Sequence, residues 1–122
     1  MGLTTVSVSN NLRSVPAYAE RALEALADPT RRQVFKRLRR RALSVGEIAA
    51  GMEVSRPAVS QHLKVLKAAR LVVDRPEGTR RVYAVDTRGV EALRKWLDRF
   101  WDEALAAFQQ AAEREAAKER RR

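Results

Sequence analysis

Hydrophobic residues in the middle of the chain repeat every three or four positions in two neighbouring stretches, which is the spacing of amphipathic helices. The first stretch carries Val45, Ile48, Ala49 and Met52. The second carries Val59, Leu63 and Leu66. Gly51 falls in the last turn of the first helix and Val54 fills the turn that follows. The pattern from residue 44 to residue 70 therefore predicts a helix, a tight turn and a second helix.

The second helix has a well-marked start and a polar outer face. Ser55 is a good N-cap, and Pro57 fits the first turn, where no backbone N–H is needed. His62 projects to the edge of the apolar face, and the opposite face carries no carboxylate. Short, amide-bearing and cationic side chains of this kind can reach base edges and phosphates in a major groove. We predict DNA contacts from Ser55, Arg56, Pro57, Ser60, Gln61 and Lys64, and an ordinary amphipathic surface helix is the alternative.

A β-hairpin is predicted directly after these two helices. Residues 71–75 and 80–85 have the composition of strands, and Gly78 in the intervening turn can take a positive φ at little cost. A hairpin in this position is the wing of a winged helix. We predict that its polar residues contact flanking phosphates or enter the minor groove, namely Arg75, Thr79, Arg80 and Arg81. A plain solvated hairpin is the alternative.

Two further helices are predicted before residue 44. The first begins at about Pro16, and Asp28 can cap the second with Pro29 at its first position. Arg31 and Arg32 oppose the dipole in the first turn of the second helix, so they either serve a phosphate or form buried pairs. The arginine run 39–41 indicates a solvated helix end first and DNA-backbone contact second. Residues 1–15, rich in Ser, Thr and Asn, are expected to form a flexible arm, with a short strand as the minority interpretation.

From about Thr87 the chain is predicted to form one long helix with a wide aromatic stripe. The flanks of the stripe are nearly balanced in charge, and the helix is longer than a winged-helix core can cover, so we predict a homodimer. Its interface is expected to contain Leu23, Leu93, Leu97, Phe100, Trp101, Leu105 and Phe108. The alternative is a stripe that folds back on its own core or lines a ligand pocket. The charged segment 113–122 is expected to fray.

The expected fold is therefore mainly α with a small β-hairpin: a winged helix-turn-helix with a long C-terminal dimerisation helix. It occupies residues 16–112, between an N-terminal arm (1–15) and a charged tail (113–122). A chain of 122 residues allows one such domain and leaves no room for a separate catalytic domain.

Charge and composition narrow the choice of partner. The chain has 25 basic and 15 acidic residues, and residues 28–81 alone hold 14 basic and 5 acidic ones. The excess of positive charge is thus concentrated in the segment that contains the predicted helix-turn-helix, which indicates a polyanionic partner. There are no cysteines, so we expect no thiolate metal site. No apolar run approaches the ~20 residues of a membrane span, so we expect a soluble, cytoplasmic protein. No nucleophile and base are spaced to act together, so we expect neither an enzyme nor a cofactor.

Four segments together resemble the ArsR/SmtB family of bacterial winged-helix repressors, and most closely its SdpR-like branch. They are residues 27–32, 43–49, 55–66 and 78–83. The resemblance covers about residues 18–105. It implies a homodimer that binds double-stranded DNA at an inverted-repeat operator and represses transcription.

Metal-sensing members of that family differ from this chain at their ligand positions. Ser44 and Gly46 stand where such members carry two thiolates. In the last helix Asp86 matches the other familiar site, but Arg88 replaces its first histidine and no second histidine exists. The resemblance therefore implies no metal site.

The leading hypothesis is a sequence-specific transcriptional repressor. The alternative is a nonspecific or architectural nucleic-acid-binding protein that uses the same charge without reading bases. The operator, the regulated genes and the inducing signal stay open, since a small-molecule inducer, a protein inducer and no inducer are all compatible with the sequence.

Overall fold

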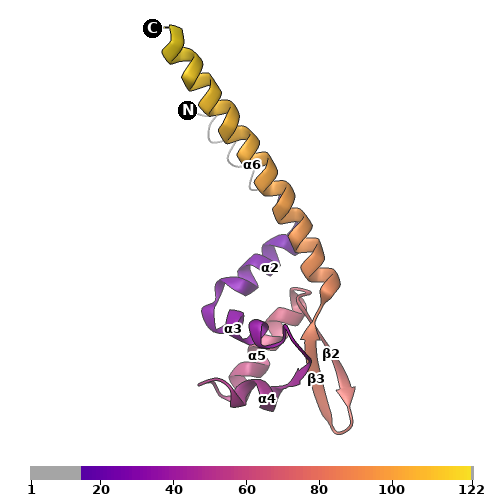
Figure 1. Ribbon diagram of the computed structural model, residues 1–122. Coiled ribbons are helices and arrows are strands. Elements are labelled where there is room, and N and C mark those ends of the chain that lie inside the picture. The colour runs from indigo at the N-terminus through magenta and orange to yellow at the C-terminus, as the bar shows by residue number, and fades with distance from the viewer. Residues whose placement is uncertain (1–14, 122) are drawn as a thin grey trace.

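The computed structural model describes residues 15–121, and shows a small helical body from which one long helix projects (Figure 1). The elements in chain order are α2 (Ala17–Ala27), α3 (Pro29–Arg37), β1 (Leu43–Ser44), α4 (Val45–Ala50), α5 (Arg56–Ala68), β2 (Val72–Glu77), β3 (Arg80–Val85) and α6 (Thr87–Arg121). This order confirms the predicted winged helix-turn-helix fold. The expected N-terminal arm lies outside the described residues, except for Val15, which packs against the core.

Side-chain caps set the starts of α3 and of the two helices of the helix-turn-helix, α4 and α5. Asp28 accepts a hydrogen bond from the Arg31 N–H at 3.0 Å, with Pro29 in the first turn of α3, as predicted. Ser55 accepts from the Ala58 N–H at 3.3 Å and begins α5 at the predicted residue. Ser44 and Glu47 form a reciprocal capping box at the start of α4, which the sequence reading missed although Ser-x-x-Glu is its signature.

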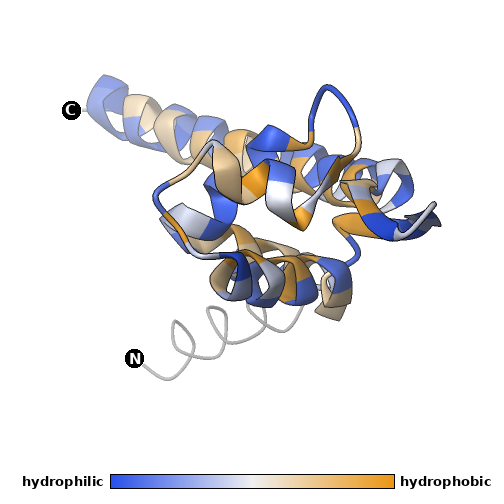
Figure 2. Ribbon diagram, turned by 90° about the horizontal axis from the view of Figure 1, so that it is seen from below, coloured by the Kyte–Doolittle hydropathy of each residue, from blue (hydrophilic) through white to orange (hydrophobic). Residues whose placement is uncertain are grey.

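The apolar face of α5 forms the centre of the core. Val59, Leu63 and Leu66 are fully buried, together with Val34 of α3 and Ile48 of α4. Burial of each such side chain contributes about 1.5–3 kcal/mol relative to leaving it in water. Figure 2 shows the helices banded in orange and blue along their length, as amphipathic helices packed on one face are. The predicted inner and outer faces of α5 are therefore correct.

The wing belongs to a three-stranded antiparallel sheet of order β1-β3-β2. Glu77 pairs with Arg80, so the loop is only Gly78 and Thr79, and Gly78 has a φ of 65°. The strands thus extend further into the turn than the four-residue loop we predicted, and Pro76 is tolerated because β2 is an edge strand. β1 was not predicted, because two residues are too few to show an alternating pattern.

A left-handed residue ends α5 and directs the chain into the wing. Arg70 has a φ of 60°. Its N–H donates to the Lys67 carbonyl at 3.0 Å, and the Leu71 N–H donates to the Leu66 carbonyl at 3.0 Å. These two bonds are a Schellman motif, which is usually built on glycine. The direction of the wing relative to α5 depends on this turn.

The last helix is longer than the ordered segment we expected. α6 continues to Arg121, so the tail from residue 113 that we expected to fray is helical as far as the structure describes it. Its Ala, Glu, Lys and Arg residues are strong helix formers. Lys118, Arg120 and Arg121 in the last turn also complement the helix dipole.

Replacement of two helical glycines by alanine should change the stability of the fold in different ways, because their surroundings differ. A Cβ at Gly89 would overlap the backbone carbonyl of Arg70, whereas a Cβ at Gly46 would meet only the movable guanidinium of Arg56. We expect Gly89→Ala to lower the free energy of unfolding by about 1–3 kcal/mol, because the backbone must shift. Gly46→Ala should be neutral or stabilising, because alanine favours the helix. Urea unfolding of both variants checks this, and equal effects would contradict it.

Candidate nucleic-acid interface

The outer face of α5 is exposed and free of carboxylates. Arg56, Pro57, Ser60, Gln61 and Lys64 are all exposed, as predicted. The hydroxyl of Ser55 accepts the capping hydrogen bond, so its role is first to begin the helix. His62 is half-buried at the edge of the apolar face. This face can present an amide, a hydroxyl and cations to a groove.

A hollow joins the start of α5 to the wing. It is lined by residues from β1, α4, α5 and β3, including Ser44, Gly46, Glu47, Arg56, Arg80 and Arg81. The Arg56 guanidinium lies over α4, and a Cβ at Gly46 would stand only 3.2 Å from its Nη2 atom. The structure therefore brings together the arginines of the predicted recognition helix and of the wing.

Carboxylates hold the three wing arginines. Arg80 donates to Glu47 at 3.0 Å and to Glu77 at 3.3 Å. Arg75 lies 3.5 Å from Glu77. Arg81 donates to Asp74 at 2.9 Å. The sequence showed these acids but not the pairing of Arg80 and Arg81, because their partners come from the neighbouring strand β2 and from α4.

Asp74 ties α5 to the wing. Its side chain is only 9% exposed and lies 2.7 Å from the Lys67 Nζ of α5 and 2.9 Å from an Arg81 nitrogen of β3. The hydrogen bond from Lys67, then that from Arg81, outweigh the effect of burial and hold the pKa of Asp74 below its usual value. Sequence reasoning missed this residue.

The carboxylate of Glu47 accepts a capping hydrogen bond and also forms ion pairs with two arginines. The backbone N–H of Ser44 donates to its carboxylate at 3.0 Å, and this bond is the main reason that the pKa of Glu47 is lowered. Arg80 and Arg41 lower the pKa further, at 3.0 Å and 3.7 Å. The same carboxylate therefore begins α4 and places two arginines.

The two arginines at the start of α3 have different surroundings. Arg31 donates from Nη1 to the Ala25 carbonyl at 3.2 Å, near the end of α2. Its Nε is buried and has no hydrogen-bond partner among the described residues. Arg32 is exposed. Arg31 therefore packs α2 against α3 and is half-buried, whereas Arg32 is exposed.

The aromatic stripe of α6 is mostly exposed in the single subunit. Five of the predicted interface residues have exposed side chains, with exposed fractions from 40% for Leu23 to 74% for Phe108. They are Leu23, Phe100, Trp101, Leu105 and Phe108. Leu97 is half-buried, but Leu93 is buried in the core of its own chain, so it offers almost no surface to a partner and its prediction needs correction. Trp96, which the prediction left out, stacks on Phe100 with ring centroids 5.5 Å apart.

The described part of the chain contains no group of three or more His, Cys, Asp or Glu side chains that could hold a metal ion. Nor does any helix within residues 15–121 have the length and apolarity needed to cross a membrane.

A helix-turn-helix whose second helix presents an exposed, basic outer face, followed at once by an arginine-bearing hairpin, defines a winged-helix DNA-binding protein. A helix-turn-helix domain model matches residues 26–75. The chain is 59% identical over 96 residues to the HTH-type transcriptional regulator Rv2034 of Mycobacterium tuberculosis, covering 79% of this chain and 90% of that protein. It is 31% identical over 77 residues to the transcriptional repressor SdpR of Bacillus subtilis, covering 63% and 86%.

Solved structures agree with these relatives. An ArsR-like transcriptional regulator from Rhodococcus sp. RHA1 matches with a TM-score of 0.68 and 31% identity, covering 79% of this chain and 93% of that one. A homodimeric winged helix-turn-helix domain of Mb0332 from Mycobacterium bovis matches with a TM-score of 0.58 and 31% identity, covering 72% and 82%. The chain belongs to the ArsR/SmtB family of winged-helix transcriptional regulators. It is a DNA-binding regulator and not an enzyme, while its place in the SdpR-like branch stays a prediction.

Replacing Asp74 by Asn tests the link between α5 and the wing. We expect the free energy of unfolding at pH 7 to fall by on the order of 1 kcal/mol, because Lys67 and Arg81 lose a charged acceptor. The pKa of Asp74 is lower in the folded chain than its ordinary 3.8, so the stabilisation is complete above that value and is lost as the pH falls through the folded pKa. Unfolding curves of wild type and variant should therefore converge on acidification. A difference that stays constant down to pH 2 would contradict the assignment.

Proposed function

We propose that the protein is a homodimeric, sequence-specific repressor that binds an inverted-repeat operator. The observation that carries this proposal is the carboxylate-free outer face of α5, with Gln61 and Ser60 between the cations Arg56 and Lys64. An amide can pair in a bidentate manner with adenine and an arginine with guanine, whereas lysine and the wing arginines suit phosphates. The name of SdpR as a repressor supports the direction of regulation.

The ion pairs of the wing do not prevent phosphate binding. The wing arginines are half-exposed or more, and the pairs of Arg75 and Arg80 with Glu77 are exposed on both sides, so each contributes only about 0–1 kcal/mol. Asp74, the partner of Arg81, is only 9% exposed, but it keeps Lys67 as a partner if Arg81 turns to a phosphate. Phosphates can therefore replace or share the carboxylates at low cost. Before DNA binds, the acids hold the guanidinium groups close to the surface of the wing.

The proposed dimer follows from the exposed stripe on α6. Aromatic and aliphatic side chains in such number on one helix are typical of an interface with another chain. A two-fold symmetric dimer presents two copies of α5, and such dimers bind inverted repeats whose half-sites lie about 34 Å apart in successive major grooves. The homodimeric state named for the Mb0332 domain supports this assembly.

A nonspecific DNA-binding protein is the competing function. Selection of bound fragments from random genomic DNA distinguishes the two, because a base-reading protein should enrich one motif and bind it at least ~10³ times more tightly than scrambled DNA. A reporter gene with that motif across its promoter then tests repression. Enrichment without a shared motif would favour the nonspecific function.

Two glutamates on the stripe should abolish the dimer. We expect the Trp101→Glu and Leu105→Glu double variant to be monomeric and to lose operator binding, because charges would have to be buried. Sedimentation velocity at micromolar concentration measures this. The control is Ala106→Glu with Gln110→Glu, which adds the same charges at the same spacing on the opposite face of α6 and should leave the dimer intact. A wild type that is monomeric under these conditions would refute the proposed dimer.

Substitutions on α5 and on the wing should affect DNA binding differently, the first through sequence preference and the second through overall affinity. Gln61→Ala should weaken operator binding by about 1–3 kcal/mol with little effect on random DNA, because an amide on a base edge carries sequence information. Arg81→Ala should weaken both and reduce the magnitude of the slope of log K against log salt by about 1 per subunit, because fewer counterions are released. Asp74 keeps Lys67 as partner in that variant. Equal effects of Gln61→Ala on operator and random DNA would show that α5 does not read bases there.

A further inference from the structure

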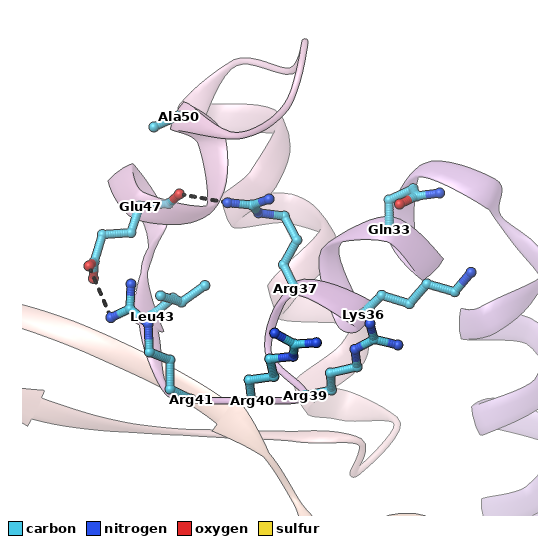
Figure 3. Close-up of a pocket in the computed structure, with 9 residues that line it drawn as sticks. All are labelled: Gln33, Lys36, Arg37, Arg39, Arg40, Arg41, Leu43, Glu47 and Ala50. Carbon is cyan, nitrogen blue, oxygen red and sulfur yellow. Dashed lines mark hydrogen bonds and ion pairs between the residues drawn. The ribbon is translucent and has the colours of Figure 1, made fainter.

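A second cationic hollow lies beside the proposed interface, between the end of α3, the loop of residues 38–42 and α4 (Figure 3). We call it the arginine pocket, and the residues that matter are Lys36, Arg37, Arg39, Arg40, Arg41 and Glu47. Figure 3 shows the side chains of the loop arginines rising from the chain toward the hollow, while Arg37 reaches across it. A nitrogen of Arg37 lies 3.5 Å from the backbone carbonyl of Glu47. The pocket is thus built by two helices and the loop.

The charges of the arginine pocket are not balanced within the chain. Five of its lining residues are cations and only Glu47 is an acid. That carboxylate is already shared between Arg41 and Arg80. Among the described residues no ion pair involves Lys36, Arg39 or Arg40. The end of α3 offsets roughly half an elementary charge, which is a small part of the excess.

The chemistry of the pocket suits phosphate. Guanidinium groups stay charged at any physiological pH and present planar pairs of donors that match phosphate oxygens. These arginines are exposed and long, so ordering them around one small ion in water would cost side-chain entropy. A phosphate that belongs to a DNA molecule already bound nearby has a high effective concentration at the pocket. The cost of bringing the ligand to the pocket from solution is then largely avoided. The pocket therefore favours DNA over a free phosphate.

Glu47 connects the arginine pocket to the winged-helix surface. One of its carboxylate oxygens lies 3.0 Å from Arg80 of the wing and the other 3.7 Å from Arg41 of the loop. Glu47 also lines the hollow between α5 and the wing. Cations therefore continue from the wing into the loop with a single acid between them.

We propose that the arginine pocket binds phosphates of the DNA that flanks the operator, so that each subunit covers more DNA than its helix and wing contact. This inference rests on the DNA-binding function proposed above. It resolves the arginine run 39–41 in favour of backbone contact over a merely solvated helix end.

The test compares two lengths of DNA and two pairs of arginines. One duplex is trimmed to the selected operator, and the other adds about one helical turn, ~10 base pairs, on each side. The test variant is Arg39→Ala with Arg40→Ala, and the control is Arg120→Ala with Arg121→Ala, which removes the same charge at the far end of α6. Circular dichroism confirms that both are folded.

We expect wild type and control to bind the longer duplex about tenfold more tightly than the trimmed one, and the test variant to lose this gain. Its salt slope on the longer duplex should fall in magnitude by about 2 per subunit, and its affinity for the trimmed duplex should stay within twofold of wild type. Failure of the wild type to prefer operator over scrambled DNA would refute the proposed function itself. If the wild type prefers the operator but binds both duplex lengths equally well, the proposed role of the arginine pocket is refuted and the proposed function is not. The same holds if the control variant loses the length-dependent gain in affinity as fully as the test variant.

Inorganic pyrophosphate provides the second arm of the experiment. Titrated calorimetrically into DNA-free protein, it should show no saturable binding at millimolar concentration. A stoichiometric site that disappears in the Arg39→Ala and Arg40→Ala variant would show that the pocket holds a free phosphate compound, and would overturn its assignment to flanking DNA.

Discussion

Burial of one face of α5 determines where its other face points. Val59, Leu63 and Leu66 have no exposed surface, so α5 cannot rotate about its axis without bringing them into water. The polar face is then held outward, and the Schellman turn at Arg70 sends the chain into β2 at a set angle. Asp74 adds a cross-link between Lys67 and Arg81. The outer face of α5 is thus positioned by the core and needs no contact with DNA to form.

Glu47 shows how a small domain uses one side chain for two purposes. Its hydrogen bond with Ser44 begins a helix of only six residues, which could not be stable alone. Its other contacts hold Arg80 and Arg41. A glutamine would keep the cap and lose the charge, whereas an alanine would lose both. Loss of fold and loss of arginine placement can therefore be separated at this position.

Patterns over several turns were readable from the sequence, and contacts between distant residues were not. The periodicity of Val59, Leu63 and Leu66 gave the correct inner face of α5, and the Ser55 cap gave its first residue. The strand β1 exists only because Leu43 and Ser44 pair with residues 82 and 83, far along the chain. The partners of the wing arginines also depend on that folding. Leu93 had the spacing of the exposed stripe, but its place near the start of α6 puts it in the core.

The exposed stripe of α6 has a consequence for how sharply the protein could respond to its own abundance. Under the proposed assembly two subunits must meet before either can hold an operator, and mass action governs that step. When most subunits are single, the number of paired ones rises with the square of their total concentration. Halving the synthesis of the chain would then reduce operator occupancy almost fourfold at low concentration. The hydrophobic side chains around Trp101 would thereby set the cellular concentration at which control of transcription begins.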